Sequence, residues 1–108
     1  MTLQRPASLT DEFLRGLVAR VPSSDGRSWK LTEVYTGDLL VELPQSTPFD
    51  VERAFAAARA AQAKWAAWPL RKRLAVFKRA HALFIERAQT TADLIQAESG
   101  KNRRMAIE

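Results

Sequence analysis

The chain has 108 residues, a mass of 12.1 kDa and a net charge of +5, and 46% of its residues are hydrophobic and 27% charged. This length allows one small domain, and the composition excludes the collagen-like and low-complexity classes. No cysteine is present, which excludes a disulfide framework, a thiolate nucleophile and a cysteine-bearing zinc site, and favours a reducing compartment.

The positive charge is concentrated in the second half of the chain. Residues 1–47 carry five Lys/Arg and six Asp/Glu, whereas residues 48–108 carry twelve and six. No stretch approaches the roughly 20 consecutive apolar residues that a membrane-spanning helix needs, and the first residues lack the apolar segment of a signal peptide. We therefore expect a cytoplasmic protein with no membrane partner.

The start of the chain predicts a short helix followed by a linker. Apolar residues recur at helical spacing over residues 9–21, and Thr10 is a candidate N-cap. Residues 22–26 (PSSDG) favour a turn. We expect residues 1–30 to form an N-terminal helix and linker, separate from residues 31–108.

A two-stranded antiparallel hairpin is predicted over residues 31–43. Apolar residues alternate there, so that Leu39, Val41 and Leu43 would share one face. Gly37 lies between the two runs and tolerates the positive φ of a turn. A hairpin of this kind needs a strand or helix to cover its apolar face. We expect this face to have little to pack on.

A long alanine-rich helix is predicted over residues 48–67. Thr47 can serve as its N-cap, Pro48 suits its first position, and Asp50 at the third position favours the positive end of the helix. Trp68-Pro69 ends this helix, because a proline cannot donate a backbone hydrogen bond and pushes the residue before it out of the helical region.

A second long helix is predicted over residues 69–88. Its predicted buried stripe contains Leu70, Leu74, Phe77, His81, Phe84 and Ala88, and another face carries Arg71, Lys72, Lys78 and Arg79. The spacing of these two sets is that of an amphipathic helix. We expect Phe55 and Trp65 of the preceding helix to pack with Phe77 and Phe84 as a small helical core.

A third helix is predicted from residues 89–91, with a threonine as its cap, to Ser99-Gly100. Residues 101–108 also have a helical pattern, but no cap, turn or closing apolar face follows them. The predicted fold class is therefore an α+β fragment: an N-terminal helix, a two-stranded hairpin and three to four helices. We expect the sequence to be the incomplete front portion of a larger domain.

Residue types that perform chemistry are few. His81 is the only histidine, so an imidazole-rich metal site is excluded and a structural role is expected. The glycines at positions 16, 26, 37 and 100 are too far apart to form a G-x-G-x-x-G or Walker loop. We therefore expect no catalytic, no cofactor-binding and no metal-binding residue in this chain.

Two functional alternatives compete with a structural role for the charged residues. Asp50 with Glu52, or Glu86 with Asp93, could form carboxylate pairs, but these residues lie on polar helix faces or near a helix start, where capping and solvation are expected. The basic residues at 71, 72, 78 and 79, near two tryptophans, could contact phosphates and bases. A solvated helix face has the same pattern. A small basic helical module that binds nucleic acid or an acidic partner remains the alternative function.

An ordered set of motifs resembles the opening segment of the aldehyde dehydrogenase superfamily. The set comprises Val34-Tyr35-Thr36-Gly37-Asp38, the strand to Leu43-Pro44, Asp50-Val51 at the start of the alanine-rich helix, Trp65 and Pro69, Arg73 and Leu74, and Glu98-Ser99-Gly100-Lys101. Their order and spacing over residues 31–108 match as a set. Val34-Tyr35 stands where many members have Asn-Pro, and Asn102 where many have proline. These features look closer to the succinate-semialdehyde dehydrogenase-like branch.

The resemblance implies the front part of a Rossmann-like, NAD- or NADP-dependent enzyme that oxidises an aldehyde to an acid, with succinate semialdehyde as one such aldehyde. The family uses a cysteine nucleophile, oxyanion donors and a nicotinamide hydride acceptor. None of these parts matches a position here, so this segment alone is expected to be inactive and to bind no coenzyme. The implied partners are the remainder of the fold and the aldehyde. The complete enzyme is expected to be a homo-oligomer, and nucleic acid is not expected as a partner.

Overall fold

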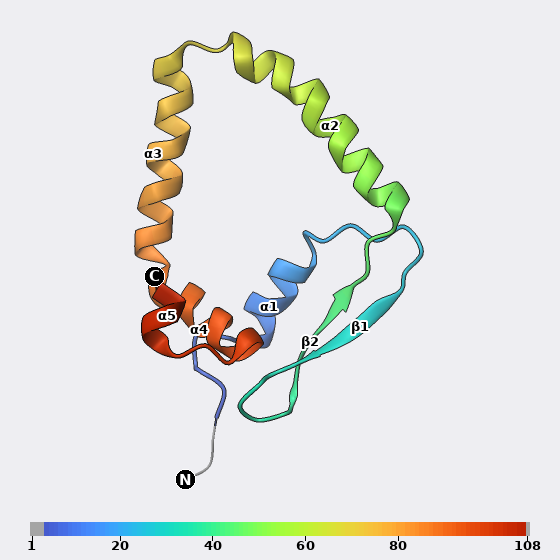
Figure 1. Ribbon diagram of the computed structural model, residues 1–108, viewed down its shortest axis with the longest axis vertical. Coiled ribbons are helices and arrows are strands. Elements are labelled where there is room, and N and C mark those ends of the chain that lie inside the picture. Colours follow the sequence, from blue (N-terminus) through green and yellow to red (C-terminus); the bar gives the residue numbers. More distant parts are fainter. Residues whose placement is uncertain (1–3, 108) are drawn as a thin grey trace.

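The computed structural model describes residues 4–107 (Figure 1). In chain order the elements are α1 (Asp11–Val18), β1 (Ser28–Thr32), β2 (Leu39–Pro44), α2 (Pro48–Ala67), α3 (Leu70–Glu86), α4 (Ala88–Ser99) and α5 (Arg103–Ile107). The α+β class and the single antiparallel hairpin are thereby confirmed for the described residues. This part of the chain contains no parallel pair of strands, so the Rossmann-like arrangement remains a prediction for a complete enzyme.

The helices begin and end largely where local signals predict. The Oγ1 of Thr10 accepts a hydrogen bond from the backbone N–H of Phe13 at 3.1 Å. At the start of α2, Thr47 Oγ1 accepts from the Asp50 N–H at 3.2 Å, while the Asp50 carboxylate accepts from the Thr47 N–H at 2.8 Å. This reciprocal pair is a capping box. Trp68 ends α2 in an extended conformation, ψ 142°.

The predicted threonine cap of α4 is wrong. Arg87 is the N-cap, without a side-chain hydrogen bond, and it is also the C-cap of α3. Its φ of −101° and ψ of 9° bend the chain within a single residue. The backbone of Thr91 already donates to the Arg87 carbonyl at 2.9 Å, so residues 89–91 lie inside the first turn of the helix.

The hairpin contains a register shift that changes which residues face the core. Leu31 pairs with Val41 and Thr32 with Leu39, which leaves Leu40 without a partner across the strands. Such a β-bulge redirects the side chains that follow it. Leu40 is therefore buried, at 4% exposure, whereas Leu39 is 46% exposed. The prediction that Leu39 shares the buried face of the hairpin with Val41 and Leu43 is therefore wrong for Leu39, and Leu40 is buried instead. In addition, β1 begins at Ser28, ahead of the predicted residue 31.

The core lies between the hairpin, α1 and α4. Its buried cluster consists of Leu9, Leu14, Leu40 and Ala97, with Leu31, Val41 and Leu94 packed against it. The prediction that the hairpin has little to pack on is therefore wrong, because α1 and α4 cover it. Periodicity shows that a helix has an apolar face but does not show which element that face meets.

Helices α2 and α3 project away from this core and meet at a corner (Figure 1). Phe55, Phe77 and Phe84 are 63%, 65% and 69% exposed, so the predicted core between the two helices and the predicted buried stripe of α3 are wrong. Trp68 and Pro69 are both extended, with ψ of 142° and 143°, and do not reverse the chain. At the corner, Trp65 contacts the edge of the Phe77 ring, with centroids 6.2 Å apart.

The consequence is an open shape. The Cα radius of gyration is 17.4 Å, compared with about 13 Å expected for a compact domain of this length. In Figure 1, α2 and α3 form two sides of a triangle whose base is the hairpin, α1 and α4. Only the base contains a core.

The turn after β1 is bonded to the end of α4. The backbone N–H of Val34 donates to the Ala97 carbonyl at 2.9 Å. The Tyr35 hydroxyl lies 3.0 Å from the carbonyl oxygens of both Gly100 and Lys101 and shares its single proton between them. The Ala97 carbonyl lies in the last turn of α4, where backbone acceptors lack helical partners, and Gly100 and Lys101 follow directly after the helix. Two motifs that are distant in the sequence, 34–38 and 98–101, therefore lie in contact.

Glycine is required at position 100 for two reasons. The residue has a φ of +71°, in the left-handed region, and a Cβ placed on it would lie 2.9 Å from Cγ1 of Val34. Any other residue would strain the backbone and push the turn away from α4.

We predict that Gly100→Ala lowers the free energy of unfolding by about 1–3 kcal/mol, the cost of a strained backbone position. Gly16→Ala is the matched control, because Gly16 lies in α1 with nothing within 4 Å of an added Cβ. It should raise stability by about 0.5–1 kcal/mol. Urea unfolding followed by far-UV circular dichroism measures both. Equal effects of the two substitutions would contradict the proposed role of Gly100.

Candidate interaction surface

The carboxylates that could have formed catalytic pairs have different surroundings. Glu52 and Glu86 are exposed, Asp93 is half-buried, and Asp50 is only 5% exposed. His81 is exposed on α3. The hydrogen bonds of Asp50 and Asp93 show whether these carboxylates are free to act as acids or bases.

The Asp50 carboxylate joins the linker after α1 to the start of α2. Besides the Thr47 N–H and hydroxyl, it accepts from the Ser24 backbone N–H at 3.0 Å and from the Ser24 hydroxyl at 3.2 Å. The hydrogen bond from the Thr47 backbone is the main cause that lowers the pKa of Asp50, and it prevails with the other bonds over the opposing effect of burial. This carboxylate is therefore a structural, ionised cap.

The Asp93 carboxylate ties three segments together. The Ser8 hydroxyl donates to it at 2.6 Å, and the Arg103 guanidinium of α5 donates to its other oxygen. Burial raises the pKa of Asp93, but the hydrogen bonds from Ser8 and Arg103 outweigh burial, so the pKa is lowered. Arg103 also donates to Gln96 at 2.9 Å and to Gln89. The cluster holds the N-terminal segment and α5 against α4.

The start of α2 is the helix start that follows a strand, and it is capped by side chains. A pyrophosphate needs free backbone N–H groups at a helix start, supplied by a glycine-rich loop after a strand. Here α2 follows β2, but Pro48 has no N–H, the Asp50 N–H donates to Thr47 Oγ1, and the Asp50 carboxylate accepts the Thr47 N–H. Its negative charge would also repel a phosphate. Among residues 4–107 there is likewise no group of three or more His, Cys, Asp or Glu residues that could hold a metal ion.

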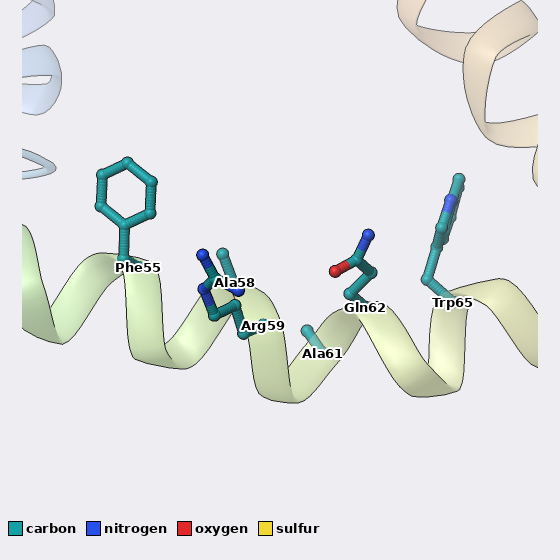
Figure 2. Close-up of a pocket in the computed structure, with 6 residues that line it drawn as sticks. All are labelled: Phe55, Ala58, Arg59, Ala61, Gln62 and Trp65. Atoms are coloured by element: carbon teal, nitrogen blue, oxygen red, sulfur yellow. The ribbon is translucent and has the colours of Figure 1, made fainter.

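Helices α2 and α3 carry nine exposed large apolar side chains, which together we call the α2–α3 surface. Its members are Phe49, Val51, Phe55, Leu70, Leu74, Val76, Phe77, Phe84 and Ile85. Figure 2 shows that Phe55, Gln62 and Trp65 project from the same side of α2, where they line a hollow of about 620 Å³. Exposed apolar side chains in this number are typical of an interaction site.

A second hollow, of about 810 Å³, lies where α3 approaches α1 and α4. Apolar side chains dominate its lining: Phe13 and Leu17 of α1, Leu83 and Phe84 of α3, and Leu94 of α4. Phe84 belongs both to this hollow and to the α2–α3 surface.

Basic side chains accompany this apolar surface. Residues 48–87 contain nine Lys/Arg and three Asp/Glu. The ammonium group of Lys72 lies 3.7 Å above the Trp68 ring, a cation–π contact. The α2–α3 surface was not predicted, because the apolar stripes of the two helices were expected to pack against each other. The extended Trp68-Pro69 junction was the signal that could have revealed it.

Comparisons of the sequence with known proteins identify its family. The profile of the Aldehyde dehydrogenase family matches residues 21–108. The chain is 43% identical over 104 residues to a Mycobacterium ulcerans protein and 42% over 103 residues to a Mycobacterium tuberculosis protein, both provisionally named succinate-semialdehyde dehydrogenase (NADP(+)) 2. It is 40% identical over 105 residues to a Mycolicibacterium smegmatis protein provisionally named succinate-semialdehyde dehydrogenase (NADP(+)). No solved structure gives a significant match.

The chain therefore belongs to the aldehyde dehydrogenase family, and the resemblance of the motifs is confirmed. Each alignment covers 95% of this chain but only 20% of the relative, so the chain spans about a fifth of the length of these relatives. Among the described residues, no helix is long and apolar enough to cross a membrane.

We predict that acid releases the link between Ser24 and the start of α2. Because the pKa of Asp50 is lower in the folded chain than in the unfolded chain, the stabilisation is present above the unfolded pKa, about 4, and is lost as the pH falls through the folded value. The amide protons of Ser24 and Thr47 should lose protection, relative to their intrinsic exchange rates, at the acidic end of an NMR titration. Asp50→Asn should remove this step, and a step that persists in this variant would assign it to another group.

Proposed function

We propose that this chain forms the front part of an NADP-dependent aldehyde dehydrogenase that oxidises succinate semialdehyde to succinate. Its own part in the enzyme is structural: it offers the α2–α3 surface to the rest of the fold. The single observation that supports this role is the exposure of the apolar residues on both helices. The printed names of the relatives support the aldehyde and the coenzyme, and they favour NADP over NAD.

The reaction needs parts that this chain does not supply. A thiolate attacks the aldehyde in this family, and the sequence contains no cysteine. The start of α2, the helix that follows a strand, is closed by Asp50. We therefore propose that the chain contributes no catalytic, coenzyme-binding or metal-binding residue. We also propose that the complete enzyme is cytoplasmic and homo-oligomeric. Residues 1–30 are proposed to form an N-terminal helix and linker, and residues 31–108 the front portion of the dehydrogenase domain.

We predict that the isolated chain forms no NADPH from succinate semialdehyde and NADP⁺. A second protein, in which this chain replaces the matching segment of the Mycolicibacterium smegmatis relative, should form NADPH at a rate within about tenfold of that relative, since large core surfaces tolerate volume-conserving changes. Absorbance of the reduced coenzyme measures both rates.

The control for the exchange protein is Phe77→Asp, which places a charge on the α2–α3 surface. It should abolish activity by preventing assembly, which gel filtration detects, because an unpaired buried charge is costly. Turnover by the isolated chain, or an exchange protein with unchanged activity after Phe77→Asp, would refute the proposed role.

We further predict weak, salt-sensitive binding of this chain to DNA, since Arg71, Lys78 and Arg79 are exposed on one helix without a base-reading element. Fluorescence anisotropy with a labelled oligonucleotide should show binding that disappears as salt is raised to the physiological range. Sub-micromolar binding at physiological salt would instead favour the nucleic-acid alternative.

A further inference from the structure

The side chain of Arg5 bonds the segment ahead of α1 to the hairpin. Its guanidinium donates to the Leu39 carbonyl at 2.7 Å and to the Asp11 carboxylate at 3.1 Å. Its Nε lies 4.0 Å from a carboxylate oxygen of Glu33. Glu33 directly follows β1 and Leu39 begins β2, so Arg5 lies where the two strands meet the turn that joins them.

Glu33 needs this cation because its carboxylate is buried. The side chain is 3% exposed, and it accepts a hydrogen bond from the Thr36 hydroxyl at 3.0 Å. Arg5 is the cation that the described residues place within 4.0 Å of it. An isolated charge in the interior is costly, and the removal of one partner of a buried pair leaves the other uncompensated. The burial of Glu33 therefore depends on the position of Arg5.

The Leu39 carbonyl lies beside the β-bulge of the hairpin. The register shift leaves Leu40 without a partner across the strands, and a bulge interrupts the ladder of backbone hydrogen bonds. A hydrogen bond from a charged donor is stronger than one between neutral groups. The Arg5 guanidinium therefore stabilises the bulge that directs Leu40 into the core.

The same segment is anchored at α4. Leu9 is 2% exposed in the core, and the Ser8 hydroxyl donates to the Asp93 carboxylate at 2.6 Å. We call residues 5–9 the N-terminal strap. The strap contacts the hairpin and α4, the two elements that the turn at residues 34–38 also joins.

The N-terminal strap lies outside the family match. The family profile begins at residue 21, whereas the alignments with the Mycobacterium relatives cover 95% of the chain and so extend ahead of that residue. The turn at residues 34–38 belongs to the part that the profile matches. A segment beyond the family profile therefore contacts the element that contains one of the family motifs.

We propose that the N-terminal strap locks the hairpin turn onto α4, with Arg5 as its positioning residue. Arg5 acts through Glu33. The Glu33 N–H donates to the Asp38 carbonyl at 2.8 Å, and its carbonyl accepts the Gly37 N–H at 2.8 Å, so this backbone closes the turn. The next residue, Val34, makes the hydrogen bond to α4. A movement of the Glu33 carboxylate toward water would carry Val34 away from the helix.

The first experiment is a double-mutant cycle on the full chain. Arg5→Met should lower the thermal midpoint of the helical signal by about 5 °C or more, because it leaves the Glu33 carboxylate buried without its cation. Glu33→Gln should raise the midpoint in the Arg5→Met background but not in the parent. Arg20→Met is the matched control and should leave the midpoint unchanged, since the exposed side chain of Arg20 makes no hydrogen bond or ion pair within residues 4–107.

The second experiment, amide hydrogen exchange, separates positioning from general stability. In Arg5→Met, the amide proton of Val34 should lose protection by roughly tenfold or more relative to that of Thr91, whose hydrogen bond lies in the first turn of α4. Arg5→Lys should restore part of this protection, because lysine keeps the charge but lacks the planar set of donors.

Each outcome supports or overturns the lock. Additive effects of Arg5→Met and Glu33→Gln would show that the two side chains do not interact and would overturn the inference. An equal loss of protection at Val34 and Thr91 would also overturn it, because general destabilisation would then explain the result. If Arg5→Met does not fold, recovery of the helical signal on addition of Glu33→Gln supports the lock, and failure to recover contradicts it. Neither readout depends on the activity of a complete enzyme.

Discussion

The hydrogen bonds from Val34 and Tyr35 to the end of α4 determine the rest of the structure. They bring a helix from the last part of the chain against the hairpin, where Ala97 completes the cluster around Leu40. Carbonyl groups that a helix end leaves without partners become the acceptors for the turn. Because α4 is held there and Arg87 joins it directly to α3, the end of α3 is held at the base as well.

The buried core is small for a chain of this length. Its fully buried apolar residues are Leu9, Leu14, Leu40, Ala92 and Ala97, two of which are alanines. Burial of so few methyl and methylene groups offsets little of the conformational entropy that folding removes. The polar clusters around Asp50 and Asp93 therefore have a large share in holding the segments together. Membership of a family whose matched relatives are about five times longer accounts for the missing apolar contacts.

The sequence predicted features that depend on neighbouring residues. The caps at Thr10 and Thr47, the break at Trp68-Pro69 and the stop at Gly100 all rest on local backbone chemistry, and the structure confirms them. Features set by distant contacts were not predictable in the same way. The bulge that buries Leu40 depends on pairing between strands, and the position of the core depends on which helix returns to the hairpin. The exposure of Phe77 depends on an angle at the corner, which hydrophobic periodicity does not encode.

The extended junction at Trp68-Pro69 also has a mechanical consequence. Helix α2 has 20 residues and α3 has 17, which correspond to rods of about 30 Å and 26 Å. Each helix is held at the end that lies away from the corner. The Asp50 cap holds the start of α2, and the single-residue joint at Arg87 holds the end of α3. A triangle with three fixed sides has fixed angles, so the location of the corner follows from the lengths of the helices. One inserted residue would lengthen a side by about 1.5 Å and rotate everything beyond it by about 100°. The number of residues in α2 and α3 is therefore as strongly constrained as their composition.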